Sequence, residues 1–98
     1  MAATTSIPAS VQKELIPYLH FPKDDVLHSD KERRERLEKL DKATVIGNLD
    51  HTKVAIIFED VHGLKRVETT IWATTEENIV LKQGAVIPIH RIHDVEFV

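Results

Sequence analysis

The C-terminal stretch AVIPIHRIHDVEFV constrains the fold of this chain more than any other. Apolar residues recur at every second position in residues 85–89 and again in residues 94–98, which is the period of a pleated β-strand. Residues 90–93 break this period, are too few for a helix, and contain a single apolar residue, Ile92. We therefore predict a strand, a one-turn corner anchored by Ile92, and a closing strand. Pro88 cannot donate a ladder hydrogen bond, which predicts that the first strand lies at a sheet edge or faces a gap at that point.

The residues before this stretch carry further strand-like patterns. The longest runs from Leu64 to Ala73 and places Trp72 on the face expected to point outward. Other strands are predicted at residues 44–49, 53–59 and 78–82, and turns at residues 50–52, 60–63, 74–77 and 83–84. Gly47 and the β-branched residues favour a strand at residues 44–49, and an extension of the preceding helix to about residue 46 is the alternative. These short strands predict a mainly β (α+β) domain, a small SH3-like or Sm-like barrel of five to six antiparallel strands.

The stretch SDKERRERLEKLDK predicts the clearest helix, at residues 29–43. Ser29 and Glu32 have the spacing of a capping box, in which the serine oxygen accepts from the backbone N–H of Glu32. Acids precede bases by four residues in three pairs, so the helix surface neutralises its own charge. The pairs are Glu32 with Arg36, Glu35 with Lys39, and Glu38 with Lys42. The apolar side is narrow and consists of Leu37, Leu40 and Ala43, which predicts that the helix covers the barrel along one stripe.

Residues 1–28 are predicted to be an N-terminal extension of a single domain at residues 29–98, in which the barrel occupies residues 44–98. Val11, Leu15 and Leu19 share one helical face, so a short helix is predicted within residues 6–19 despite Pro17. The following sequence HFPKDDVLH has no clear period and predicts a connector. Its candidate anchors onto the main body are Tyr18, Phe21, Val26 and Leu27.

Charge is divided unevenly along the chain, and this bears on its partners. Residues 44–98 contain five Lys or Arg and eight Asp or Glu, so the β-rich part is poorly suited to nonspecific nucleic-acid binding, which depends on clustered basic groups. The chain has no cysteine, which fits a reducing compartment. The longest apolar run, Val54–Phe58, is too short to span a bilayer, and residues 1–10 lack the basic and apolar regions of a secretory signal. We expect a cytoplasmic protein without a membrane segment.

The order of these elements resembles a known family. A helix followed by strands and by Ile87-Pro88-Ile89-His90-Arg91-Ile92-His93-Asp94-Val95 is similar in layout to the small bacterial Sm-like barrels, with the Rho-binding antiterminator family as the nearest layout. The resemblance covers residues 29–98 and rests on pattern. The turn at His90 and Arg91 lacks the glycine of true Sm proteins. The resemblance implies a protein or RNA partner and no catalysis.

Trp72 is the leading candidate for a binding residue. It is the only tryptophan, and an aromatic side chain on the outside of a sheet can anchor a protein partner or stack on a base. The alternative is that the helix at residues 29–43 covers it. Ile57 lies on the outward side of the neighbouring strand, and Arg66 and Arg91 complete the predicted interaction surface.

His90 and His93 are candidate metal ligands, because they are three residues apart and are followed by Asp94. A zinc site needs three or four converging donors, and two histidines in one corner do not supply them. The sequence has no nucleophile elbow, P-loop or GxGxxG pattern. We therefore predict no enzyme activity and no cofactor.

Three functions remain open from the sequence. The first is a non-catalytic protein-interaction or regulatory module, whose partner is another protein or a second copy of the chain, because both faces of Val54–Phe58 need cover. The second is sequence-tolerant RNA binding by an Sm-like barrel through Trp72, Lys65, Arg66 and Arg91. The third is metal binding through the His90–His93 corner.

Overall fold

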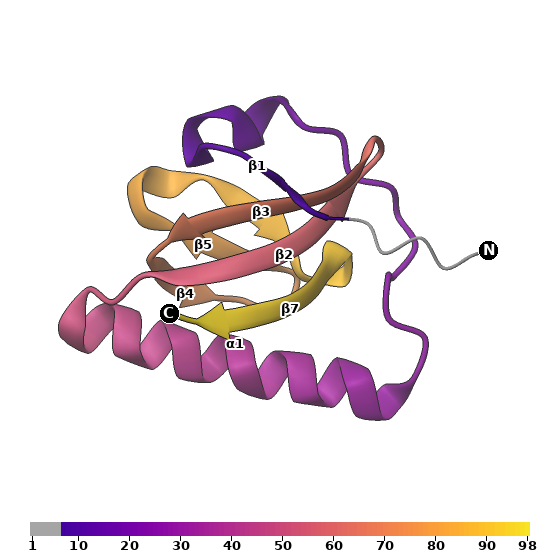
Figure 1. Cartoon of the computed structure of the whole chain (residues 1–98). Coiled ribbons are helices and arrows are strands. Elements are labelled where there is room, and N and C mark those ends of the chain that lie inside the picture. The colour runs from indigo at the N-terminus through magenta and orange to yellow at the C-terminus, as the bar shows by residue number, and fades with distance from the viewer. Residues whose placement is uncertain (1–6) are drawn as a thin grey trace.

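The chain folds into one long helix and two small sheets (Figure 1). The computed structural model describes residues 7–98. The strands are β1 (Ala9–Ser10), β2 (Val54–Asp60), β3 (Gly63–Thr69), β4 (Ile71–Thr74), β5 (Asn78–Leu81), β6 (Val86–Pro88) and β7 (Ile92–Phe97). The helical elements are α1 (Asp30–Asp50) and the 3-10 turns η1 (Lys13–Tyr18), η2 (Lys82–Gly84) and η3 (Ile89–Arg91). The predicted α+β class is confirmed.

Both sheets face a common core. The first has the strand order β1-β3-β2-β7 and the second β4-β5-β6. β1 runs parallel to β3, and every other pair is antiparallel. The prediction of one continuous strand at residues 64–73 is wrong at Thr70, because the chain passes there from the first sheet to the second. The Thr70 carbonyl accepts from the Lys82 N–H at 2.9 Å.

Helical segments fill the gaps between the two sheets. On one side α1 packs against the edge strands β4 and β7, and on the other side η1 packs against β3 and β6. Leu40 and Ala43 of α1 and Ile16 of η1 are buried in these gaps. Strand pairing crosses neither gap within residues 7–98, so the predicted closed barrel is not found. Apolar helix surfaces bury the core where a barrel would use hydrogen-bonded strands.

The predicted C-terminal corner is confirmed. η3 forms one turn between β6 and β7, and the side chain of Ile92 directly after it is fully buried. Pro88 ends β6, which is an edge strand as predicted. Ile92 joins Val54, Ile56 and Phe58 of β2 in one apolar core. The two-residue period of β2 therefore identifies the inward face correctly.

α1 begins as predicted and ends later. The Ser29 Oγ accepts from the Glu32 N–H and donates to the Glu32 Oε1, both at 3.1 Å. The helix ends at Asp50 and is capped by His51, whose φ of 55° is left-handed and whose N–H donates to the Gly47 carbonyl. The predicted strand at residues 44–49 is therefore wrong. Within residues 7–98, no helix combines the length and the apolar character needed to cross a membrane.

Gly47 sets how closely α1 approaches β4. A Cβ atom at this position would lie 2.5 Å from the Ile71 carbonyl oxygen and 3.0 Å from the Thr70 Cγ2. Contact this close between two backbones requires a residue without a side chain. From the local sequence, Gly47 favours a strand. In the folded protein it lies in α1, where its lack of a side chain allows the helix to contact β4.

The N-terminal extension lacks the predicted helix within the described residues, and residue 6 of the predicted range lies outside them. β1 and η1 take its place, with Pro17 inside η1. Ile16 reaches the core, whereas Leu15 of the predicted stripe is exposed, because a tighter helix with three residues per turn presents different side chains inward. Of the predicted anchors, Phe21 packs against Phe58 with ring centroids 6.0 Å apart.

Gly47→Ala tests the approach of α1 to β4. Alanine favours a helix over glycine by about 1 kcal/mol, but here its Cβ would overlap the β4 backbone, and overpacking costs about 1–3 kcal/mol. We expect a lower free energy of unfolding in urea for Gly47→Ala. Asp41→Ala, at an exposed position of the same helix, is the control and should be at least as stable as the wild type. Equal stability of the two variants would contradict the close contact.

Candidate functional site

Two β-bulges lie at residues that the sequence singles out. In the β4–β5 pair the register shifts by one residue at Trp72, and in the β2–β7 pair it shifts at His93. A bulge bends its strand and turns the extra side chain in a new direction. Alternation predicts that Trp72 points outward, and in the structure its direction is also set by the bulge at this residue.

α1 covers the backbone of β4 beside Trp72 but leaves the indole open. Asn48 Nδ2 donates to the Trp72 carbonyl at 3.1 Å, and the hydroxyls of Thr44 and Thr74 are 2.7 Å apart. The Trp72 side chain remains accessible, and the residue is 45% exposed. The alternative in which the helix covers Trp72 thus holds for its main chain and not for its side chain.

Other exposed apolar side chains accompany Trp72 around the C-terminal half of α1. Val45 and Leu49 lie one turn apart on α1 and are 55% and 73% exposed, and Phe97 and Val98 at the end of β7 are also exposed. The Lys42 Nζ lies 5.3 Å from the centroid of the Phe97 ring, which places that ring beside α1. We call Val45, Leu49, Trp72, Phe97 and Val98 the apolar end. Several exposed apolar side chains in one region are typical of a contact surface.

Ile57 and Arg66 lie on the first sheet, whereas Trp72 belongs to the second. Ile57 and Arg66 oppose each other directly in the β2–β3 pair, so both side chains lie on the outer face of the first sheet. Arg66 Nη1 lies 2.7 Å from Glu68 Oε2, and its Nε lies 3.8 Å from Glu96 Oε1. Two carboxylates therefore balance the charge of Arg66, and this face is not a basic patch.

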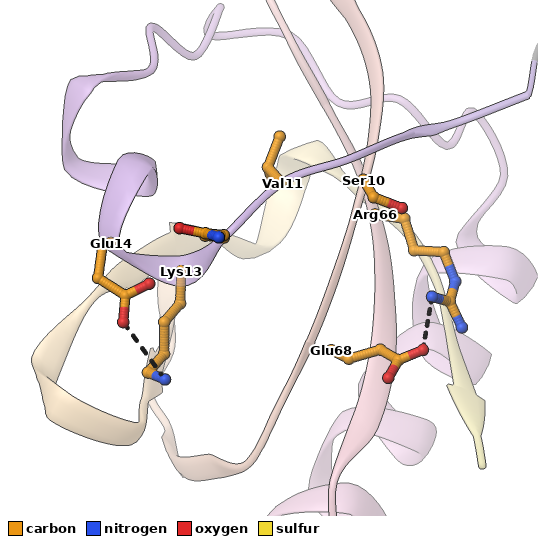
Figure 2. A pocket seen from close by; sticks show the side chains of 7 residues that line it. Ser10, Val11, Lys13, Glu14, Arg66 and Glu68 are labelled. Carbon is orange, nitrogen blue, oxygen red and sulfur yellow. Dashed lines mark hydrogen bonds and ion pairs between the residues drawn. The ribbon is translucent and has the colours of Figure 1, made fainter.

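An open groove of about 580 Å³ runs beside Arg66 (Figure 2). One wall is the chain from β1 into η1, and the other is β3. The lining residues are Ser10, Val11, Gln12, Lys13, Glu14, Arg66 and Glu68. Figure 2 shows the charged side chains paired within each wall, Lys13 with Glu14 at 3.5 Å and Arg66 with Glu68. The groove thus offers balanced charges and the backbone of β3.

Arg91 does not lie on the predicted interaction surface. It is 4% exposed, and its Nε donates to the Glu59 carbonyl at 3.0 Å and its Nη1 to the Asp24 carbonyl at 2.8 Å. The guanidinium therefore joins β2, the connector and the corner. Its role in this fold is to hold the corner in place, and it is not available to a partner.

The two histidines of the corner turn to different partners. His90 Nε2 lies 2.8 Å from the Pro22 carbonyl oxygen, and His93 Nε2 lies 2.8 Å from Glu59 Oε1. Within the described part of the chain, no group of three or more His, Cys, Asp or Glu side chains is arranged to hold a metal ion. His90 and His93 thus do not converge on one metal site in this corner.

Arg36 and Asp25 form the main polar contact between α1 and the connector. Arg36 is buried, its Nη1 and Nη2 each lie 2.8 Å from a carboxylate oxygen of Asp25, and Nη1 also donates to the Ile92 carbonyl at 3.0 Å. Burial raises the pKa of Asp25, but the hydrogen bonds from Arg36 and the Leu27 N–H, with the charges of Arg36 and Arg33, outweigh it. The pKa therefore lies below its ordinary value of 3.8.

Sequence reasoning missed this pair. The helical spacing predicts Arg36 in a surface pair with Glu32, and it predicts Leu37 on the buried stripe, yet Leu37 is exposed. A signal was present, because Arg36, Leu40 and Ala43 follow the i, i+4, i+7 spacing of one helix face. A charged residue on that face needs a partner of opposite charge, and the connector acids were the candidates.

Asp25→Asn tests the contact between the connector and α1. Because the pKa of Asp25 is lowered in the folded state, the stabilisation from this carboxylate is complete above 3.8 and is lost as the pH falls through the lowered value. We expect Asp25→Asn to lose about 3 kcal/mol in urea unfolding at neutral pH, as when one partner of a buried pair is removed. Its stability should fall less steeply than that of the wild type below about pH 4. Asp41→Asn is the exposed control, and parallel acid profiles for Asp25→Asn and wild type would contradict the assignment.

Comparison with known proteins supplies no relative from which a function could be transferred. No family model, curated protein or solved structure matches the chain.

Proposed function

We propose that this protein is a non-catalytic protein-interaction or regulatory module built on an SH3-like or Sm-like framework. The framework is supported by the bent β3–β4 strand, by the 3-10 turn before the last strand, and by the return of β7 to pair with β2. A cytoplasmic location belongs to the same proposal and is supported by the absence of cysteine from the sequence.

The apolar end is the observation that carries this proposal. Trp72, Val45 and Leu49 are large apolar side chains on rigid elements, a bulged strand and a long helix. Aromatic anchors beside aliphatic side chains are typical of the residues that contribute most to protein–protein binding. These side chains are exposed on a helix and on a strand, which favours a protein partner over a small molecule, because small-molecule sites bury most of their ligand in a cleft.

The placement of the basic side chains favours a protein partner over RNA. Arg91 and Arg36 are buried in internal contacts, and Arg66 is balanced by Glu68 and Glu96. Binding to single-stranded RNA needs basic side chains that track the phosphates beside the stacking aromatic. Three of the arginines that could supply them are engaged elsewhere.

Val45→Asp is expected to abolish partner binding, because it places a charge inside the apolar end. The matched control is Val61→Asp, the same substitution at a side chain that is also 55% exposed but lies in the β2–β3 turn. Affinity capture from the native host should recover at least one protein with wild type and with Val61→Asp that is absent with Val45→Asp. Both variants should match the wild type in circular dichroism.

Trp72 gives a second readout, because it is the only tryptophan in the chain. Addition of the captured protein should change its fluorescence if the partner covers the indole. Equal capture by both variants, or an unchanged emission spectrum on binding, would contradict the apolar end as the contact. Recovery of RNA that is lost steeply with added salt would instead favour the RNA-binding alternative.

A further inference from the structure

Three edges of the two sheets are closed by side chains or by proline. Along β7, Arg36 donates to the Ile92 carbonyl and the Asp94 carboxylate accepts from the Val95 N–H. Along β4, Asn48 donates to the Trp72 carbonyl. β6 is three residues long and ends in Pro88, which has no N–H to offer. Each of these edges is therefore a poor template for another strand.

The remaining edge, along β3, pairs with β1 alone among the strands of residues 7–98. β1 has two residues, both exposed, and it opposes only Lys65 and Arg66 of the seven residues of β3. The Val11 N–H donates to the Arg66 carbonyl at 2.9 Å, after which the chain leaves β3. The pairing is also parallel, and parallel ladders are slightly less stable per residue.

The groove beside Arg66 begins where β1 leaves β3 (Figure 2). Backbone groups two residues apart in a strand face the same edge, so Glu68 presents its N–H and carbonyl on the same side as Arg66. Glu68 lines this groove, and no described strand opposes it there. The edge of β3 thus continues beyond β1 into open space of about 580 Å³.

We propose that the edge of β3 is a strand-addition site, and that an extended segment of a partner protein binds it by displacing β1. Strand addition supplies main-chain hydrogen bonds, and nearby pockets supply the preference for side chains. β1 shows the chemistry that fits, namely small side chains opposite Lys65 and Arg66 and a free N–H for the Arg66 carbonyl. Beyond them, a partner segment would meet the paired charges of Arg66 and Glu68.

This inference rests on the proposed function as a protein-interaction module and adds a second contact surface to it. β3 lies in the first sheet, whereas Trp72 lies in the second and Val45 and Leu49 lie on α1. Variants of the apolar end therefore leave the edge of β3 intact. The two surfaces can fail or succeed separately.

Hydrogen exchange of the full-length wild type tests whether β1 can leave. If β1 opens while the domain stays folded, the Val11 amide, bonded to the Arg66 carbonyl, should exchange on the order of 100-fold faster than the Val67 amide inside the first sheet. The two amides would exchange at the same rate, set by global unfolding, if β1 were an integral part of the sheet. That result would overturn the proposal.

A peptide with the sequence of residues 7–12, IPASVQ, tests whether the edge accepts a strand in trans. The receptor is the full-length Val11→Pro variant, in which the N–H that bonds the Arg66 carbonyl is absent. NMR shifts should concentrate on the amides of residues 64–68, and half-saturation should need about tenfold less peptide than for the wild type, where the tethered β1 competes. The same peptide with proline in place of valine is the matched control.

The outcomes separate this inference from the proposed function. Shifts that are equal for both peptides, or that are absent, would overturn the strand-addition site. Loss of partner capture by Val45→Asp would still support the apolar end in that case. If Val11→Pro does not fold, the exchange rates of the wild-type amides decide the question.

Discussion

The position of α1 between β4 and β7 is the contact on which the rest of the structure depends. The two sheets do not pair with each other on that side, so the core would be open to water without the buried side chains of Leu40 and Ala43. The contact requires Gly47, because a Cβ atom there would meet the backbone of Ile71 at 2.5 Å. The helix thus performs the closure that a hydrogen-bonded strand performs in a barrel, and its path fixes which surfaces stay exposed.

Two buried arginines, Arg36 and Arg91, have a structural role in this fold. Arg36 and Arg91 lie within the fold and bind the connector through Asp25 and through the carbonyl of Asp24. Such pairs add little net stability over apolar residues of the same shape, since both charges must be dehydrated. These contacts join the connector to α1 through Arg36 and to the corner through Arg91, at the adjacent residues Asp25 and Asp24. The corner at residues 89–93 is held from outside by this arrangement.

Local sequence patterns predicted the elements whose signal lies in a few adjacent residues. The period of β2, the corner at η3 and the Ser29 cap depend on a few adjacent residues, and each is present in the structure. The end of α1 depends instead on contact with β4, and this contact overrides the strand that Gly47 and the β-branched residues favour locally at residues 44–49. β1 was missed because it pairs with Lys65 and Arg66, more than fifty residues away, and its two residues carry no period. At the candidate site, alternation placed Trp72 outward, whereas the burial of Arg91 followed from contacts that sequence spacing does not report.

The treatment of sheet edges limits how this domain can recognise a partner. Side chains of Arg36, Asp94 and Asn48 occupy backbone groups along β7 and β4, and Pro88 leaves β6 without a donor. Natural sheets use such devices to prevent indiscriminate pairing. The proposed recognition of a partner then has two routes, through exposed side chains such as Trp72, or through the edge of β3, which among residues 7–98 pairs with one short parallel strand. The two surfaces are joined by the backbone, because β3 passes directly into β4, which carries Trp72, at the buried Thr70. A partner bound at the edge of β3 would therefore contact the strand that leads to Trp72.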